Sequence, residues 1–396
     1  YEDNVIKKVA TDMGRGHTWK GVNVGVYYGD PKTETDPYFN GLGPLRHGCK
    51  ECAACMIGCR YNAKNTLDKN YLWFAEKYGA EVFPETLVTK IEYADGIYTI
   101  HTQKSTVWGK KNVRSFRSKN LVVSGGVLGT MDLLLRQKHL YKTLPNLSDR
   151  LGQNIRTNSK SMCGVSLSKE KLNNGVSITS IFAPDDQSHI EIIKYPDYGD
   201  GMKLFATLQT GKGPFRGLKM IGNILTRPVS FLRMMFNRKW AQNSMLIMVM
   251  QVADSAMDMK FKKFPWPRLS LKHRKKDRIP VYNEIAQEVT KRFADEVGGI
   301  AANSITEVMF NMSTGDHIMG GSPMGETAND GVVNKRFEAF GYPGLYILDG
   351  TIIPCNLGVN PSLTITALSE YAMDQIPEKE GNKQRSLEKR MAEVNV

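Results

Sequence analysis

Hydrophobic and polar residues follow two different periods over residues 64–140. Apolar side chains recur at helical spacing from Lys64 to Tyr78, and Gly79 follows them, so this segment is predicted to be a helix. Shorter apolar runs then indicate strands at 81–83, 87–93, 97–101, 112–116 and 120–124. The last run stops at Gly125-Gly126, and a helical pattern continues to Leu140. A helix, a β meander, a strand, a glycine turn and a second helix are typical of part of a dinucleotide-binding α/β domain.

The pattern changes on either side of this segment. Residues 1–60 are rich in Gly and Pro and are predicted to be mostly loop, with one short strand at Val22–Tyr28. From residue 151 to about residue 308, strand-like runs alternate with a basic, Met-rich amphipathic stretch. From Gly315 the chain is rich in glycine again. We therefore expect one domain to be interrupted by another.

The glycine fingerprint of a dinucleotide-binding turn, G-x-G-x-x-G, does not occur in the chain. The triplets at 14–16, 41–43 and 211–213 each have a larger residue where the third glycine belongs. In that turn, glycines allow a pyrophosphate to reach the N terminus of a helix. Either the chain binds no dinucleotide or its first βαβ unit is missing. Residues 1–4 contain neither an initiator Met nor an apolar signal segment, so we read the sequence as a fragment.

The chain is basic, with 53 Lys and Arg, 40 Asp and Glu and a net charge of +13. Nucleic acid, an anionic membrane surface and a solvated basic face are all compatible with this excess. No nucleic-acid-binding motif accompanies the charge, so we expect no nucleic-acid partner. The basic segment 203–276 includes an apolar stretch from Phe215 to Trp240. This stretch leaves three alternatives: a core helix hairpin, a lid over an apolar substrate, or a peripheral membrane contact.

Four of the six cysteines fall close together, in the pattern Cys49-x2-Cys52-x2-Cys55-x3-Cys59. This is the spacing of a bacterial ferredoxin segment and is compatible with an iron–sulfur cluster or a zinc ion. Arg60 stands where the ferredoxin pattern has Pro, so a purely structural role for the four thiols stays open. Clustered cysteines of this kind indicate a reducing compartment, and we expect a cytoplasmic protein, free or peripheral to a membrane.

Three ordered motifs in the last third of the chain resemble the closing signature of the glucose-methanol-choline (GMC) oxidoreductases. They are His317-Ile-Met-Gly-Gly, Leu345-Tyr-Ile-Leu-Asp349-Gly350 and Gly358-Val-Asn360-Pro361. Two earlier segments, Gly58-Cys-Arg-Tyr-Asn-Ala-Lys-Asn-Thr-Leu67 and Ser188-His-Ile-Glu191, resemble the bacterial cholesterol-oxidase-like branch of that family. Together the resemblance covers nearly the whole chain.

The resemblance implies an α/β plus α+β fold. It predicts a discontinuous FAD-binding domain that lacks its first βαβ unit, and an inserted substrate-binding domain built on an antiparallel sheet. The predicted divisions are a loop-rich segment with the cysteines at 1–60, the two FAD-binding parts at 61–150 and 309–378, the substrate-binding domain at 151–308, and a charged tail at 379–396.

The resemblance also assigns site residues. His317 is implied to be the base that takes the hydroxyl proton, a role that suits imidazole near neutral pH. The amide of Asn360 is implied to face the substrate oxygen, and Pro361 to begin a helix whose N terminus faces the flavin. The other implied FAD contacts are made through the backbone of Val88, Gly125, Gly126, Asp349 and Gly350.

The predicted reaction is flavin-dependent oxidation of an alcohol, with a 3β-hydroxysterol as the substrate and the hydride passing to flavin N5. Ser188–Glu191 is predicted to lie on a strand with Glu191 on the face opposite Ile190 and Ile192. In the family branch a glutamate here moves the double bond after oxidation, and the alternative is a surface-strand glutamate. Three other functions stay open: a dehydrogenase of another bulky or long-chain alcohol, an iron–sulfur electron-transfer protein, and a basic membrane-binding module without catalysis.

Overall fold

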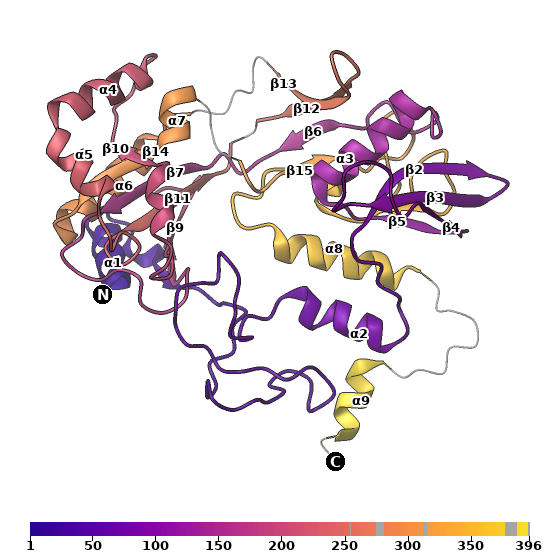
Figure 1. Ribbon diagram of the computed structural model, residues 1–396, viewed down its shortest axis with the longest axis horizontal. Coiled ribbons are helices and arrows are strands. Elements are labelled where there is room, and N and C mark those ends of the chain that lie inside the picture. The colour runs from indigo at the N-terminus through magenta and orange to yellow at the C-terminus, as the bar shows by residue number, and fades with distance from the viewer. Residues whose placement is uncertain (254, 275–280, 312–314, 377–385, 395–396) are drawn as a thin grey trace.

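The computed structural model describes residues 1–253, 255–274, 281–311, 315–376 and 386–394, which form helices and four β-sheets (Figure 1). The helices are α1 Glu2–Asp12, α2 Tyr71–Lys77, α3 Gly126–Arg136, α4 Arg216–Thr226, α5 Pro228–Met235, α6 Glu284–Val297, α7 Ile305–Phe310, α8 Ser362–Asp374 and α9 Leu387–Val394. None of these described helices has the length and apolar character needed to cross a bilayer.

The largest sheet has seven strands in the order β1-β8-β9-β11-β7-β14-β10, and every neighbouring pair is antiparallel. Its strands are β1 Lys20–Gly21, β7 Ser161–Ser166, β8 Ser180–Phe182, β9 Ser188–Ile193, β10 Ala206–Leu208, β11 Met245–Gln251 and β14 Ile300–Ser304. Helices α6 and α1 cover one face, where they form a core with alternate residues of β7, β9 and β11. On the opposite face, Ala206, Leu208 and Ala302 pack against Met234 of α5, and Ile193, Met248 and Met250 form a small buried cluster.

Helix α6 has the sequence signals of a helix packed on a sheet. The side chain of Asn283 accepts a hydrogen bond from the Ala286 amide at 2.9 Å and caps the N terminus. Gly298 ends the helix with φ +60°, a conformation that glycine adopts without strain. The apolar residues between them are buried at spacings of three and four, and they include Phe293 with no exposed surface.

A second body surrounds a two-stranded parallel sheet of β5 Leu121–Val123 and β16 Leu345–Ile347. The three-stranded meander consists of β2 Thr86–Ala94, β3 Ile97–Lys104 and β4 Arg114–Ser118. The four-stranded sheet has the order β13-β12-β6-β15, with β6 Gln153–Arg156, β12 Met257–Lys262, β13 Arg268–His273 and β15 Met319–Gly321. A hydrophobic core that includes residues of α3, β5 and β16 joins these parts. Figure 1 shows the seven-stranded sheet on the left, the meander on the right and α8 between them.

The meander and the strand–turn–helix from residue 86 to residue 141 confirm the expected elements. The β2–β3 turn places Asp95 and Gly96 at φ +52° and +74°, as a tight hairpin requires. A π-helical turn, Gln137–Tyr141, extends α3 to the predicted end. The strand predicted at 81–83 is wrong, because these residues are outside the described strands and the meander begins at Thr86.

Two further expectations about local structure are wrong. The helix predicted from Lys64 to Tyr78 is only α2, because Asn70 has φ −139° and ψ −88° and caps a new helix instead of continuing the preceding turn. In the segment expected to be loop, residues 2–12 form α1, whose apolar side chains are buried against the sheet and α6. The strand expected at Val22–Tyr28 is reduced to β1 just before it and a single bridge from Val26 to Lys64.

The observed architecture has mixed α/β content and antiparallel sheets, as the resemblance implied. The five-part division of the chain stays a prediction. The predicted boundary at residue 378 falls in residues 377–385, which lie outside the described residues. Residues 275–280, which overlap the end of the basic segment, lie outside them as well.

Candidate active site

Four chain segments bring polar side chains together at one end of the seven-stranded sheet. Strands β6 and β15 are antiparallel, with Met319 opposite Arg156. The residues that follow β6 must therefore lie beside those that precede β15. This pairing places Asn158 next to His317, with the Asn158 side-chain nitrogen 2.7 Å from His317 Nδ1. Neither the sequence motif of His317 nor its spacing indicated this partner.

Lys160 is the second neighbour of His317. Its side chain is almost fully buried, and its Nζ lies 3.5 Å from His317 Nε2 and 2.6 Å from a carboxylate oxygen of Asp316. Burial lowers the pKa of the half-buried His317, and the Lys160 ammonium lowers it further. The carboxylates of Asp316 and Glu191 oppose this effect without outweighing it. The imidazole is therefore kept neutral to a lower pH than an exposed histidine.

The hydrogen bonds also determine which imidazole nitrogen carries the proton. A neutral imidazole has one N–H and one lone pair, and the lysine ammonium can only donate. Since Lys160 faces Nε2, the lone pair belongs on Nε2 and the proton on Nδ1. Asn158 Oδ1 is buried without a hydrogen-bond partner among the described residues. Turning the Asn158 amide by half a turn gives Nδ1–H that acceptor and satisfies both groups.

Glu191 lies on β9 and is almost fully buried, which excludes the surface-strand alternative. Its Oε1 accepts a hydrogen bond from the side-chain amide of Asn360 at 2.7 Å and lies 3.3 Å from His189 Nε2. Its Oε2 is buried and has no hydrogen-bond partner among the described residues. A buried acceptor of this kind is costly unless a ligand or water satisfies it.

Asn360 connects this carboxylate to α8. Pro361 is buried and is the residue before the first turn of α8, as the sequence predicted. The loop before it is held because the Asn356 side chain donates to the Gln251 and Ala253 carbonyls at 2.7 and 3.1 Å. His317, Glu191 and Asn360 therefore belong to one site, since Glu191 bonds Asn360 and its charge acts on His317.

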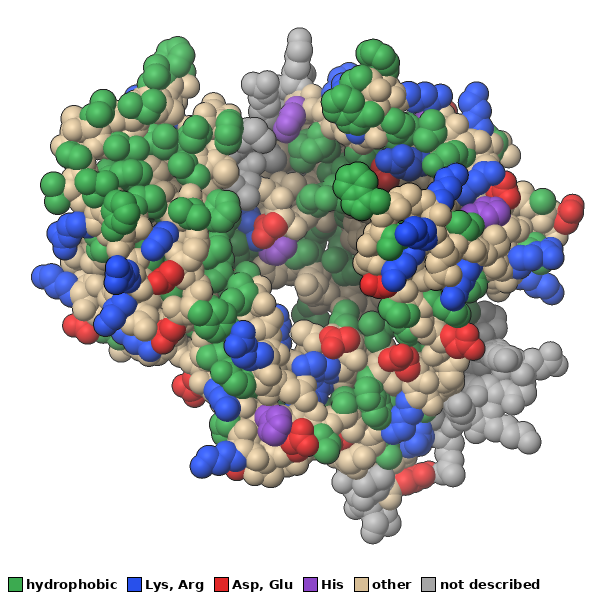
Figure 2. Space-filling view, viewed as in Figure 1, with side chains coloured by type: hydrophobic (Ala, Val, Ile, Leu, Met, Phe, Trp, Pro, Cys, Tyr) green, Lys and Arg blue, Asp and Glu red, His purple; other side chains and the backbone are tan. Residues whose placement is uncertain are grey.

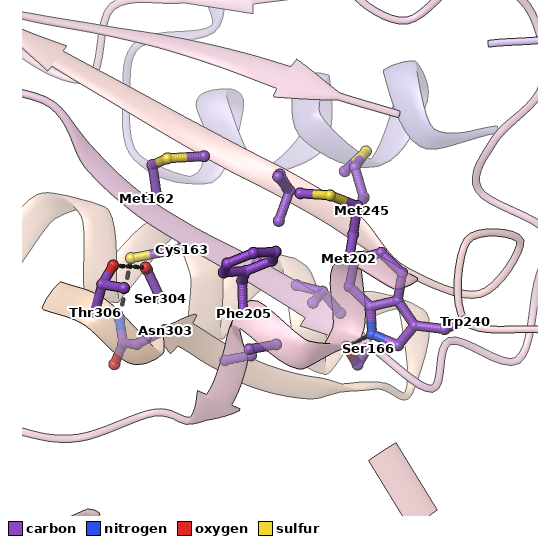
Figure 3. Close-up of a pocket in the computed structure, with 15 residues that line it drawn as sticks. Met162, Cys163, Ser166, Met202, Phe205, Trp240, Met245, Asn303, Ser304 and Thr306 are labelled. Carbon is purple, nitrogen blue, oxygen red and sulfur yellow. Dashed lines mark hydrogen bonds between the residues drawn. The ribbon is translucent and has the colours of Figure 1, made fainter. Parts of the chain in front are cut away.

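An apolar cavity of about 310 Å³ lies on the same face of the sheet as Glu191 (Figure 3). In the sheet register, Met248 lies directly between Glu191 of β9 and Met162 of β7. Met162 and Leu246 of β11 both line the cavity, so the cavity wall begins on the strand next to Glu191, and the Met162 backbone lies two strand spacings, about 10 Å, from that of Glu191. The other walls include Met202, Phe205, Trp240, Leu246 and Ala302. The cavity size and composition are those of a site for a bulky apolar ligand.

Two of the predicted backbone contacts, Val88 and Gly125, line a second cavity, of about 590 Å³. Gly125 and Gly126 form the exposed turn between β5 and α3, and Gly126 has φ +68°. A Cβ added at Gly126 would meet no atom within 4 Å, so a ligand can approach this backbone closely. The glycine turn is therefore accessible at the end of a parallel strand, where α/β domains bind cofactors.

Asp349 and Gly350, by contrast, are buried at the end of β16. Asp349 accepts hydrogen bonds from Thr130 of α3 and from the Thr351 amide. Thr130 in turn accepts one from the Gly125 amide at 3.0 Å. Asp349 therefore connects the two strand ends and positions the glycine turn, and neither Asp349 nor Gly350 lines the second cavity.

The four clustered cysteines line one small cavity with apolar neighbours such as Ala54, Ala63 and Val176. All four are free and partly buried. Within the described part of the chain, no group of three or more His, Cys, Asp or Glu side chains is placed to hold a metal ion. The predicted iron–sulfur or zinc centre at Cys49, Cys52, Cys55 and Cys59 is therefore not supported: a shared cavity does not bring the thiols into a metal-binding arrangement.

Comparisons with known proteins agree with this geometry. Residues 46–155 and 233–369 match the N-terminal and C-terminal family models of the GMC oxidoreductases. The chain is 39% identical to a cholesterol oxidase of Acinetobacter baumannii over 393 residues, which are 95% of this chain and 70% of that protein. It is 37% identical to a cholesterol oxidase of Mycobacterium tuberculosis over 398 residues, 95% of this chain and 68% of that protein.

Among solved structures, pyridoxine 4-oxidase from Mesorbium loti aligns with a TM-score of 0.53 over 94% of this chain and 69% of its own, at 10% identity. This likeness concerns the fold alone. The family models and the identity to the cholesterol oxidases show that the chain belongs to the GMC oxidoreductases. It is an FAD-dependent oxidoreductase that acts on CH–OH groups.

Proposed function

We propose that this enzyme oxidises a bulky apolar alcohol, a 3β-hydroxysterol, to the ketone. The observation that carries the proposal is the apolar cavity on the same sheet face as Glu191, a carboxylate whose Oε2 has no hydrogen-bond partner among the described residues. The two cholesterol oxidases support the substrate class, because they match over 95% of this chain. A fused-ring alcohol suits a cavity lined by Met, Phe and Trp, since such side chains bury a large rigid apolar body.

The residues present fit FAD at the open glycine turn of Gly125 and Gly126 and along Val88. FAD supplies the acceptor for the hydride that leaves the carbinol carbon. His317 Nε2 takes the hydroxyl proton, because Nε2 carries the lone pair and the lowered pKa keeps it unprotonated. Asn158 holds the ring in the required tautomer, and Asn360 holds the Glu191 carboxylate in place.

Glu191 then acts on the ketone product. The carbon between the new carbonyl and the ring double bond is acidic, and Glu191 removes a proton from it with Oε2. The same proton returns at the far end of the former double bond, so the conjugated ketone forms without any net change in atoms or electrons. A carboxylate fixed by Asn360 through one oxygen leaves the other free for this transfer.

The test is the visible spectrum of the purified full-length protein under anaerobic conditions, before and after a 3β-hydroxysterol is added in detergent micelles. We expect flavin absorption that is lost on addition. In the His317→Ala variant the flavin bands should persist after the sterol is added. In the exposed His17→Ala control they should be lost, as in the wild type.

Flavin bands that persist with the sterol, but are lost with a long-chain alcohol, would reject the sterol. Reoxidation by oxygen or only by an artificial acceptor then separates an oxidase from a dehydrogenase. Loss of the bands in His317→Ala at the wild-type rate would contradict the role of His317.

A further inference from the structure

Helices α4 and α5 present their apolar side chains to the outside. In α4 only Arg216 and Met220 are buried, and in α5 only Met234. The exposed apolar side chains, which we call the α4–α5 patch, are Phe215, Leu218, Ile221, Leu225, Val229, Leu232 and Phe236. Three of them, Leu218, Leu225 and Phe236, are 67%, 74% and 77% exposed. The core-hairpin alternative for this segment is therefore wrong.

The spacing of these residues gives each helix one continuous apolar face. Leu218, Ile221 and Leu225 follow at i, i+3 and i+7 on α4, and Val229, Leu232 and Phe236 repeat the same spacing from α5 to the residue after it. Figure 2 shows hydrophobic side chains gathered over α4 and α5 at the upper left. A continuous exposed apolar patch of this kind indicates a surface that binds a partner.

The charge around the patch indicates what kind of partner binds there. Between Gly201 and Trp240 the chain has eight Lys or Arg residues and no Asp or Glu. Lys219 on α4, Arg233 on α5 and Arg227 between the two helices are exposed beside the apolar face. An amphipathic helix pair with an apolar face and cationic edges has the composition of a segment that lies in the interface of an anionic bilayer.

The patch is also built over the apolar cavity. Met202 and Phe205 before α4, and Trp240 after α5, line that cavity. Lys203 donates to the Asn237 carbonyl at 3.0 Å, which joins the two ends of the segment. The buried ion pair of Arg216 with Glu307, at 3.1 Å, anchors α4 to α7, and Thr306 of α7 lines the cavity as well. The segment that contains α4 and α5 is therefore joined directly to residues that line the cavity.

We propose that the α4–α5 patch docks the enzyme on an anionic lipid bilayer, with the apolar faces of both helices in the interface and the cavity opening towards the lipid. The role of this contact in taking up the alcohol rests on the proposed function. The docking itself does not, because vesicles without any sterol can test it.

The experiment is co-sedimentation of the full-length protein with sterol-free vesicles of phosphatidylcholine alone and of phosphatidylcholine with phosphatidylglycerol. We expect binding to the anionic vesicles, weaker binding to the neutral ones, and a loss of roughly tenfold or more for Leu218→Glu/Leu225→Glu, since two charges enter the apolar face. The fully exposed Trp108→Glu in the meander is the matched control and should bind as the wild type.

Because the substituted side chains are exposed, the variants should fold, and unchanged circular dichroism and flavin content check this. Failure of the wild type to bind either kind of vesicle would overturn the proposal. So would equal binding by the double variant. A stable dimer in sedimentation velocity that the double variant abolishes, without vesicle binding, would assign the patch to a second copy of this chain. Sterol oxidation without vesicle binding would reject the docking alone.

Discussion

The imidazole of His317, the proposed base, lies in an electric field set by three neighbouring charges. Lys160 disfavours the imidazolium, whereas Asp316 and Glu191 favour it, and burial disfavours it most. Because the pKa is lowered overall, the neutral base is present at pH values where an exposed histidine would be largely protonated. The arrangement suits a base that must be free before the alcohol arrives.

Replacing Lys160 by Met should raise the pKa of His317, because a positive neighbour is removed and Asp316 loses its ion-pair partner. The acid limb of the kcat/KM profile should then move to higher pH, and activity below neutral pH should fall. The measurement is kcat/KM of the wild type and the variant across the acid range, with unfolding monitored at each pH. An unchanged acid limb would mean that another group controls it.

Replacing Glu191 by Gln should separate oxidation from isomerisation. The amide oxygen can still accept from Asn360, so the site keeps its shape, but the side chain cannot take a proton. We expect the alcohol to be oxidised and the unconjugated ketone to be released, with conjugated ketone reduced by about a hundredfold or more, since a general base contributes at least about that factor. Product chromatography distinguishes the two ketones. Undiminished conjugation would contradict the role of Glu191.

At the residue scale, sequence reasoning could find only the groups that lie within recognisable motifs. His317, Asn360 and Glu191 were predicted in this way, and the structure brings them close together. Asn158 and Lys160 lie in a segment without a motif, and their contact with His317 depends on the antiparallel pairing of β6 with β15. No feature of their own sequence indicates this pairing.

At the scale of elements, α6 packs on the face of the seven-stranded sheet opposite Glu191. Phe293→Ala should lower the free energy of unfolding by about 3–5 kcal/mol, because a fully buried aromatic side chain leaves a cavity. Urea unfolding followed by circular dichroism measures this change. The exposed Lys291→Ala on the same helix should change it by less than about 0.5 kcal/mol. Equal effects would contradict the packing described for α6.

The elements that the sequence predicted best carry their own local signals. The meander has alternating residues and an Asp-Gly turn, so its hairpin was expected within a few residues of its observed ends. Helix α1 was missed because its 11 residues lie in a segment judged by its Gly and Pro content as a whole. The break at Asn70 was missed because a capping asparagine was read as part of a continuous helix.

At the scale of the whole molecule, the charge of +13 makes association with a bilayer dependent on salt. Raising the salt concentration from about 0.1 M to about 1 M shortens the Debye length from roughly 10 Å to 3 Å. Binding to anionic vesicles should fall over this range and approach the binding to neutral vesicles, which the apolar faces provide. Salt-independent binding to anionic vesicles would show that the basic residues do not contribute.

The family could be predicted from ordered motifs, but the position of the apolar cavity relative to Glu191 could not. It depends on which strands are neighbours in the large sheet: β9 and β7 lie on either side of β11, although about 50 residues separate β11 from β9 in the chain. The exposure of the α4–α5 patch could not be predicted from the sequence either, because an amphipathic pattern does not show whether the apolar face contacts protein or lipid.

The strict alternation of β11 has a consequence for changing this enzyme by design. Ile247 and Val249 pack against α6, whereas Leu246, Met248 and Met250 belong to the opposite face, with Glu191 and the cavity. Folding and ligand choice are therefore encoded in interleaved residues of a single strand. A library that varies only Leu246, the even-numbered residue of β11 that lines the cavity, can explore new alcohols, whereas Met248 and Met250 belong to a small buried cluster with Ile193 and stay fixed.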